Sequence, residues 1–220
     1  MIRGLLIDLD GTVTKYNIDY QSMRRDLVSK LVELNASLPE YGDIPIFAIL
    51  ISVKERNDEE EYTRIKQHVF PILGRYEEEA AKTVEPQEGV LSTIKQLKEM
   101  KIELGLVTNN SRDPTMSILT RLGLREFFRS VVTRDETREL KPEQKGVLMC
   151  LKEMGMTPDE AIYVGDAIID VDVSKRIGMR SIIIPNGPSG LERILTKTDP
   201  DFILNNIREI PDLLKSLNQA

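Results

Sequence analysis

The chain has 220 residues, which is long enough for one large domain or for one ordinary domain with a smaller one. Its 36 acidic and 30 basic residues leave a net charge of −6, which argues against nucleic acid as its main partner. The longest apolar stretch, residues 44–53, is shorter than the roughly 20 residues of a membrane span, and Asp8 interrupts the apolar run at the N-terminus, so we expect a cytoplasmic protein that does not bind a membrane.

The first predicted element is a strand over residues 4–9, a short apolar run that ends at the turn after Asp10. From residue 14 to residue 85 the apolar side chains recur instead at helical spacing. Pro45 suits the first position of a helix over residues 46–53, although a buried strand is the alternative there. We therefore expect residues 14–85 to form a mostly helical segment inserted after the first strand.

After residue 86, short apolar strands alternate with amphipathic helices. Such alternation is typical of βαβ units, which build a parallel sheet with helices on both faces. We therefore expect an α/β, doubly wound, Rossmann-like core made of residues 1–13 and 86–220. The further strands are expected over residues 104–108, 130–133, 161–164, 181–184 and 201–204, and the helices over residues 90–100, 116–122, 147–154, 168–177 and 207–217.

Carboxylates gather at the ends of two expected strands, which is where ligands bind in such a sheet. Asp8 and Asp10 are two positions apart, so they point to the same side of a strand. Asp166 and Asp170 are four positions apart at the start of a helix, so they share one helix face. Four converging carboxylates repel one another unless a cation or a proton intervenes, and a hard cation with oxygen ligands, above all Mg²⁺, fits them.

Groups that bind anions lie at other loops of the same expected edge. Thr108 offers a hydroxyl, and the main-chain amide of Asn109 is expected to open a helix, which is a natural anion site. Lys141 supplies a compact positive charge that suits phosphate. A cation, an amide, a hydroxyl and an ammonium group around one carboxylate indicate a phosphoryl-transfer site.

Four motifs follow one another along the chain: Asp8-Leu9-Asp10-Gly11-Thr12, Val107-Thr108-Asn109, Lys141-Pro142 and Gly165-Asp166-Ala167-Ile168-Ile169-Asp170. In this order, on this pattern of strands, they resemble the motifs of the haloacid dehalogenase superfamily. The resemblance covers residues 1–13 and 86–204. Within this superfamily, the chain resembles the phosphatase branch, in which a helical cap is inserted after the first motif.

The resemblance implies a role for each carboxylate. Asp8 would attack phosphorus and form an aspartyl-phosphate, while Asp10 would protonate the leaving oxygen and then activate water. Mg²⁺ would be held by the Asp8 carboxylate, the Asp10 main-chain carbonyl and Asp166. Asp170 would orient either a metal-bound water or Lys141.

The resemblance also implies a phosphate site and a cap. Thr108, the Asn109 amide and Lys141 would bind the phosphoryl oxygens. Residues 14–85 would close over the site, exclude water and select the substrate. Arg24 and Arg25, near the start of this segment, lie either on an exposed helix face or within reach of a substrate anion. Lys15 and Tyr16, which directly follow the turn of the first motif, are either exposed or placed to gate the site.

We therefore predict a Mg²⁺-dependent phosphatase, a phosphoric monoester hydrolase that acts on a small phosphorylated metabolite as a monomer or homodimer. A phosphomutase is the main alternative because it shares every motif. A 2-haloacid dehalogenase is disfavoured because that branch does not need the acid–base carboxylate, which is present here as Asp10. A catalytically silent phosphate-binding protein is disfavoured because the set of catalytic side chains is complete.

Overall fold

The computed structural model describes residues 1–38, 44–186 and 190–219. The chain divides into two compact units. The first unit consists of Met1–Tyr16 and Val84–Ala220, and the second consists of Asn17–Thr83. None of the described helices is both long enough and apolar enough to cross a membrane.

Two short segments join the units, and both belong to the first one. The sequence prediction placed residues 14–16 and 84–85 in the helical segment, whereas the structure groups them with the sheet. Thr14 pairs with Pro86 in an isolated β-bridge, and the Lys15 N–H donates to the Glu85 carbonyl at 2.9 Å. The outgoing and returning chains are therefore tied together before the second unit begins.

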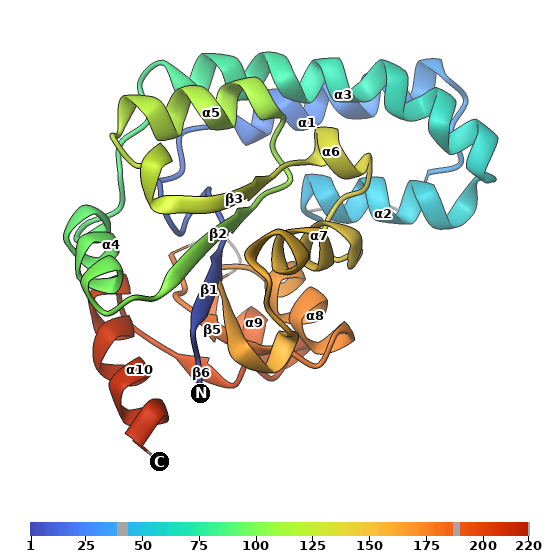
Figure 1. Cartoon of the computed structure of the whole chain (residues 1–220). Coiled ribbons are helices and arrows are strands. Elements are labelled where there is room, and N and C mark those ends of the chain that lie inside the picture. Colours follow the sequence, from blue (N-terminus) through green and yellow to red (C-terminus); the bar gives the residue numbers. More distant parts are fainter. Residues whose placement is uncertain (39–43, 187–189, 220) are drawn as a thin grey trace. The chain divides into compact units, whose positions relative to one another are not determined.

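The first unit is built on a parallel sheet in which the described residues form six strands, ordered β3-β2-β1-β4-β5-β6 (Figure 1). Each neighbouring pair of strands is parallel. The predicted doubly wound parallel sheet is thus confirmed, and every expected strand is present. The strands are β1 (Gly4–Ile7), β2 (Glu103–Val107), β3 (Phe128–Val132), β4 (Ala161–Gly165), β5 (Arg180–Ile183) and β6 (Phe202–Ile203).

Helices flank this sheet, with α4 and α10 on one side and α7 and α8 on the other (Figure 1). The sequence pattern had not indicated the short helix α6, nor the amphipathic α9. The helices are α4 (Val90–Glu99), α5 (Arg112–Arg121), α6 (Arg134–Thr137), α7 (Lys145–Met154), α8 (Ile168–Arg176), α9 (Gly190–Lys197) and α10 (Ile210–Gln219), with single 3₁₀ turns η1 (Arg125–Phe127), η2 (Pro158–Glu160) and η3 (Ile207–Glu209).

Close packing of α7 on the sheet depends on a glycine in β2. A Cβ atom added at Gly105 would lie 2.4 Å from Cys150 Sγ and 2.7 Å from Met154 Sδ, both of which belong to α7. A side chain at position 105 would therefore force the side chains of Cys150 and Met154 to shift from their places between helix and strand. Burial raises the pKa of the Cys150 thiol to about 12, so the thiol packs as a neutral, apolar group.

The second unit is helical in its described part, with α1 (Tyr20–Glu33), α2 (Ile46–Arg56) and α3 (Glu59–Ala81). The predicted helix after Pro45 is confirmed, and the strand alternative is wrong. Asp19 caps α1 by accepting the Ser22 N–H at 3.0 Å. Helices α1 and α3 are joined where the Tyr76 hydroxyl donates to Asp26 Oδ2 at 2.8 Å.

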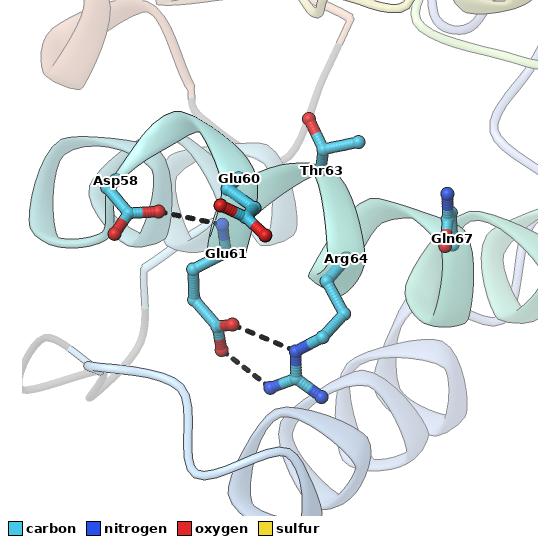
Figure 2. Close-up of a pocket in the computed structure, with 6 residues that line it drawn as sticks. All are labelled: Asp58, Glu60, Glu61, Thr63, Arg64 and Gln67. Carbon is cyan, nitrogen blue, oxygen red and sulfur yellow. Dashed lines mark hydrogen bonds and ion pairs between the residues drawn. The ribbon is translucent and has the colours of Figure 1, made fainter.

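The start of α3 carries an acidic turn that suits a helix N-terminus. Asp58 accepts the Glu61 N–H at 2.8 Å, and Glu61 accepts two hydrogen bonds from Arg64 at 2.6 and 2.8 Å. Figure 2 shows the Asp58 side chain at the Glu61 main-chain N–H and the Glu61 side chain paired with that of Arg64 along the helix. The surrounding hollow is open, and its lining consists of Asp58, Glu60, Glu61, Thr63, Arg64 and Gln67.

Candidate active site

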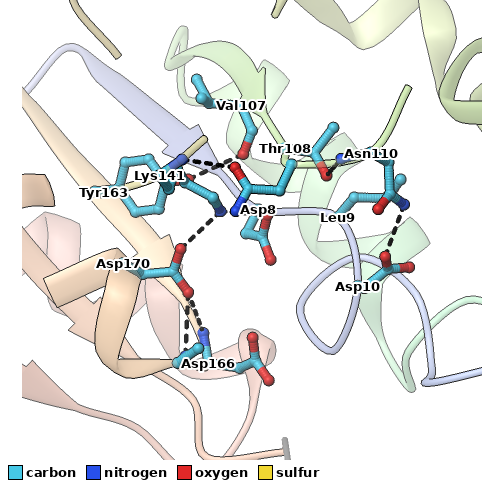
Figure 3. A network of polar contacts seen from close by, with 12 residues as sticks. Asp8, Leu9, Asp10, Val107, Thr108, Asn110, Lys141, Tyr163, Asp166 and Asp170 are labelled. Carbon is cyan, nitrogen blue, oxygen red and sulfur yellow. Dashed lines mark hydrogen bonds and ion pairs between the residues drawn. The ribbon is translucent and has the colours of Figure 1, made fainter. Parts of the chain in front are cut away.

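The predicted polar side chains follow the C-terminal ends of the central strands (Figure 3). Asp8 directly follows β1, and its N–H donates to the Val164 carbonyl of β4 at 2.9 Å. Thr108 directly follows β2, and Asp166 directly follows β4. Since β2 and β4 pair with β1 on its two sides, all three residues lie at one edge of the sheet. The strand order reverses at β1, and ligands of doubly wound sheets bind at such a reversal.

Lys141 joins two of the carboxylates. Its Nζ donates to Asp8 Oδ1 at 2.6 Å and to Asp170 Oδ1 at 2.7 Å. Its residue is only 5% exposed. Burial by itself would lower the pKa of Lys141, but the charges of Asp170 and Asp8 hold that pKa well above its ordinary value. Lys141 is therefore protonated, and its ammonium group lies between the carboxyl groups of Asp8 and Asp170.

Tyr163 completes this ion pair network, and sequence reasoning missed it. The Lys141 ammonium also donates to the Tyr163 hydroxyl at 3.0 Å, and that hydroxyl donates to the Val107 carbonyl at 2.9 Å. Burial raises the pKa of Tyr163 well above its ordinary value, so its hydroxyl stays neutral. The only signal in the sequence was one aromatic residue in an otherwise aliphatic strand, Ala161–Gly165.

Both oxygens of Asp170 are committed within the protein. Oδ1 accepts from Lys141, while Oδ2 accepts the main-chain N–H groups of Asp166 at 3.2 Å and Ala167 at 3.1 Å. A Cβ atom added at Gly165 would lie 2.3 Å from Asp170 Oδ2, so only glycine permits this approach. Asp170 therefore shapes the loop after β4 and fixes Lys141.

Asp8, Asp166 and Asp170 form a cluster of carboxylates. Each offers one oxygen atom, and these atoms all lie within 4.8 Å of one another. Burial raises the pKa of Asp8 to about 7, even though Lys141 acts to lower it. The pKa of Asp166 is raised to about 8, most strongly by burial and to a smaller extent by the charges of Asp170 and Asp8. Anions crowded in a poorly solvated space thus hold protons unusually strongly.

This cluster fits a divalent metal ion. Asp8 Oδ2 and Asp166 Oδ1 accept no hydrogen bond from the part of the chain that the structure describes, whereas both oxygens of Asp170 are used. A hard cation prefers carboxylate oxygens, and its charge would relieve the repulsion that now raises the two pKa values. The donor set therefore fits Asp8 and Asp166 as carboxylate ligands, with Asp170 as their neighbour.

The Asp10 side chain lies apart from the carboxylate cluster (Figure 3). Its Oδ2 accepts from Asn110 Nδ2 at 2.7 Å, and its Oδ1 accepts from Thr14 Oγ1 at 3.3 Å. Of the four carboxylates expected to converge, Asp10 is not in the cluster of three, although its charge still acts to raise the pKa of Asp8. The chain turns at Gly11 directly after it, so its side chain meets the loop after β2 instead.

The loop after β2 holds Thr108 and Asn109 in place. Thr108 Oγ1 accepts the Asn110 N–H at 3.2 Å, and Asn109 Oδ1 accepts the Lys141 N–H at 2.7 Å. The expectation that Asn109 opens a helix is wrong, because the extended residue Ser111 caps α5 and the helix begins after it. Asn109 Nδ2 is buried and has no hydrogen-bond partner among the described residues, which is the condition of a donor that a bound anion could satisfy.

A buried arginine that sequence reasoning missed supports the same loop. Arg134 is 2% exposed, and its Nη1 donates to the Asn109 carbonyl at 2.8 Å. Its N–H donates to the Asn110 carbonyl at 3.2 Å. The start of α6 therefore fixes the loop that carries the predicted phosphate donors.

The turn at Gly11 brings the first motif against the fourth. Gly11 has φ of +83°, and a Cβ atom there would lie 2.4 Å from Asp166 Oδ2. The Gly11 carbonyl accepts hydrogen bonds from Gln87 Nε2 and Asn186 Nδ2, each at 3.1 Å. Glycine is needed at this position because both the backbone conformation and the close approach exclude a side chain.

The six-stranded parallel sheet carries its carboxylates, buried lysine and threonine loop at one edge, which is the architecture of an α/β protein with a candidate site where the strand order reverses. The family model of haloacid dehalogenase-like hydrolases matches residues 5–184. The chain belongs to this family of hydrolases. The matched range includes all the predicted site residues.

Curated relatives carry the names of phosphatases. The glyceraldehyde 3-phosphate phosphatase of Methanocaldococcus jannaschii is 26% identical over 232 residues, with 100% of each chain covered. The pyrophosphatase PpaX of Halalkalibacterium halodurans is 35% identical over 133 residues, with 60% of each chain covered. Among solved structures, a hydrolase from Pseudomonas syringae has a TM-score of 0.70 at 18% identity, covering 98% of this chain and 99% of that one, which shows a shared fold.

Proposed function

We propose that this chain is a Mg²⁺-dependent phosphatase that hydrolyses a small phosphorylated metabolite through an aspartyl-phosphate intermediate. The observation that carries the proposal is the contact between Lys141 and Asp8 at 2.6 Å, at the reversal point of the sheet and within the carboxylate cluster. A buried cation holds the carboxylate of Asp8 at the place where a phosphoryl group would bind. The names of the relatives support a phosphatase rather than a dehalogenase.

Asp8 is the proposed nucleophile. One of its carboxylate oxygens attacks phosphorus, and the bond between phosphorus and the leaving oxygen breaks. Lys141 stabilises the ionised form of Asp8 that this attack requires. The proposed donors to the phosphoryl oxygens are Lys141, the Thr108 hydroxyl and the Asn109 amide. They stabilise the negative charge that these oxygens carry in the transition state.

Asp10 is the proposed acid and base. As an acid it gives its proton to the leaving oxygen. As a base it then takes a proton from water, whose oxygen attacks phosphorus and releases Asp8 as a carboxylate together with inorganic phosphate. Its hydrogen bonds to Asn110 and Thr14 hold it beside the loop that carries the phosphate donors.

The metal site proposed here consists of the Asp8 carboxylate, the Asp10 main-chain carbonyl and the Asp166 carboxylate. When bound, Mg²⁺ supplies positive charge that offsets the repulsion between the carboxylates and a phosphate dianion. Asp170 keeps Lys141 in place beside this site. The fit rests on the oxygens of Asp8 and Asp166 that accept no hydrogen bond from the described residues, and on the raised pKa values of both groups.

The helical second unit is the proposed cap. Support comes from its insertion directly after the first motif, which the family resemblance associates with a cap, and from the paired segments that lead to and from it. Such a cap would exclude water during the first step and select the substrate. The substrate panel follows from the names of the relatives: glyceraldehyde 3-phosphate and pyrophosphate, with an aryl phosphate as a general reporter.

The test is phosphate release by the purified full chain with Mg²⁺ and with excess chelator. We expect activity with Mg²⁺ that chelation abolishes. Asp8→Asn should reduce turnover to background, since it removes the nucleophile and a metal ligand together. Asp212→Asn is the matched control, because Asp212 lies in α10 and its partner among the described residues is the exposed Lys215, at 2.9 Å.

Each alternative predicts a different product. Isomerised sugar phosphate without free phosphate would indicate a phosphomutase, and halide release from a 2-haloacid would indicate a dehalogenase. A folded Asp8→Asn protein that keeps a tenth of the wild-type activity would rule out Asp8 as the nucleophile. Undiminished turnover in chelator would rule out the metal.

A further inference from the structure

Tyr16 lies where the chain leaves the first motif, and its side chain turns back to the carboxylate cluster. The Tyr16 hydroxyl donates a hydrogen bond to Asp166 Oδ2. Its ring lies close to the turn at Gly11: a Cβ atom added to Gly11 would be 2.6 Å from Tyr16 Cε2. The residue is half-buried and belongs to the same unit as Asp166.

The Tyr16 hydroxyl forms its hydrogen bond with one carboxylate oxygen of Asp166, Oδ2, and not with the other, Oδ1. Asp166 is 1% exposed, and Oδ1 accepts no hydrogen bond from any residue that the structure describes. The Asp166 N–H is fixed separately, by donation to Asp170 Oδ2 at 3.2 Å. The backbone of this residue and one of its carboxylate oxygens are therefore both held, and Oδ1 is the oxygen that no described residue contacts by a hydrogen bond.

The position of Tyr16 is itself fixed by the joining segments. The Lys15 N–H donates to the Glu85 carbonyl at 2.9 Å, and Lys15 Nζ pairs with the Glu85 carboxylate at 2.7 Å. Thr14 forms a β-bridge with Pro86. These contacts bring the tyrosine ring back over the sheet edge rather than leaving it on a loose connection.

We propose that Tyr16 is a positioning residue for the metal, which orients the Asp166 carboxylate so that Oδ1 faces the cation. This inference rests on the metal site of the proposed function and adds to it a residue outside the four motifs. Hydrogen-bond partners of metal ligands set the orientation and the basicity of those ligands, and their loss typically weakens metal binding about 10- to 100-fold. The hydroxyl of Tyr16 supplies such a bond to a carboxylate that would otherwise rotate.

The experiment measures Mn²⁺ binding to the full chain, from the electron paramagnetic resonance signal of the free ion, in the absence of substrate. Wild type is compared with Tyr16→Phe, which removes only the hydroxyl. Tyr76→Phe is the matched control, because the Tyr76 hydroxyl also donates to an aspartate, Asp26, but within the helical unit. Asp166→Asn marks the loss of the site, and circular dichroism verifies that each variant is folded.

We expect the dissociation constant for Mn²⁺ to rise about 10- to 100-fold in Tyr16→Phe and to stay unchanged in Tyr76→Phe. The Mg²⁺ concentration for half-maximal phosphatase activity should rise by a similar factor, while kcat at saturating Mg²⁺ stays within about twofold of wild type. A loss of kcat that saturating Mg²⁺ does not restore, or metal affinity equal to wild type, would overturn the role of Tyr16. Wild-type protein that binds no Mn²⁺, or whose binding survives Asp166→Asn, would overturn the metal site itself.

Discussion

The carboxylate of Asp166 should make the stability of the metal-free protein fall as pH rises. In the unfolded chain Asp166 ionises near its ordinary pKa of 3.8, whereas burial and the charges of Asp170 and Asp8 raise its pKa in the folded state to about 8. Between these two values the folded state binds a proton that the unfolded state has lost. This contribution to stability is fully present below pH 3.8 and is lost as pH rises through about 8.

The magnitude follows from one proton. Such a difference changes the free energy of unfolding by about 1.4 kcal/mol per pH unit, so the interval from pH 5 to pH 8 corresponds to about 4 kcal/mol. That is a large share of the roughly 5–15 kcal/mol that stabilises a typical domain. Asp166→Asn removes the titrating group and keeps its shape, so the comparison reports the titration of Asp166 together with its effect on Asp8 and Asp170.

The assay is urea unfolding in chelator, followed by circular dichroism, at four pH values from 5 to 8. The wild-type free energy of unfolding should fall relative to that of Asp166→Asn by about 4 kcal/mol across this range. Excess Mg²⁺ should cancel the decline in wild type and leave Asp166→Asn unchanged. A difference between the two proteins that does not vary with pH, or one that grows in favour of wild type as pH rises, would refute the reasoning.

Two further predictions concern buried groups of the site. Lys141→Met should cost about 3–5 kcal/mol of unfolding free energy at neutral pH, because it leaves two buried carboxylates without their shared cation. The control Lys215→Met, at an exposed ion pair, should cost at most about 1 kcal/mol. Equal costs of the two substitutions in urea unfolding would contradict the bridging role of Lys141. Gly11→Ala should abolish phosphate release and Mn²⁺ binding, because the added Cβ would meet Asp166. The control Gly123→Ala also has a positive φ, but nothing lies within 4 Å of its Cβ, so it should lose about 1–3 kcal/mol of stability and keep full activity. Phosphate release by Gly11→Ala would contradict the requirement for a tight turn at this position.

The fold was predictable because its signals are local. Each strand of the sheet is a short apolar run, and each run is followed by a turn and a helix of regular period. The order of the strands was not predictable from this pattern, although it decides which motifs meet. Asp8 and Asp166 are neighbours because β4 pairs with β1, and residues 158 positions apart in the sequence carry no local sign of that pairing.

The site was predictable where a motif names a residue, and it was not where the contact depends on how loops approach one another. Asn110 donates a hydrogen bond to Asp10, and Arg134 donates one to the Asn109 carbonyl. Nothing in the sequence around Asn110 or Arg134 indicates either contact. Tyr163 was invisible for a related reason, since a tyrosine in a buried strand is usually a packing residue whose hydroxyl finds some partner. Its partner here is the ammonium group of Lys141.

The charges of the buried cluster favour a divalent ion. Asp8, Asp166 and Asp170 carry three negative charges when ionised, and Lys141 supplies one positive charge, so the ionised group has a net charge of −2. The protein relieves this excess through the raised pKa values of Asp8 and Asp166, which keep protons in the cluster near neutral pH. A divalent cation would replace those protons and return the group to neutrality, whereas a monovalent cation would leave it charged. Because protons and metal compete for the same oxygens, metal affinity should rise with pH over the range in which the two carboxyls ionise.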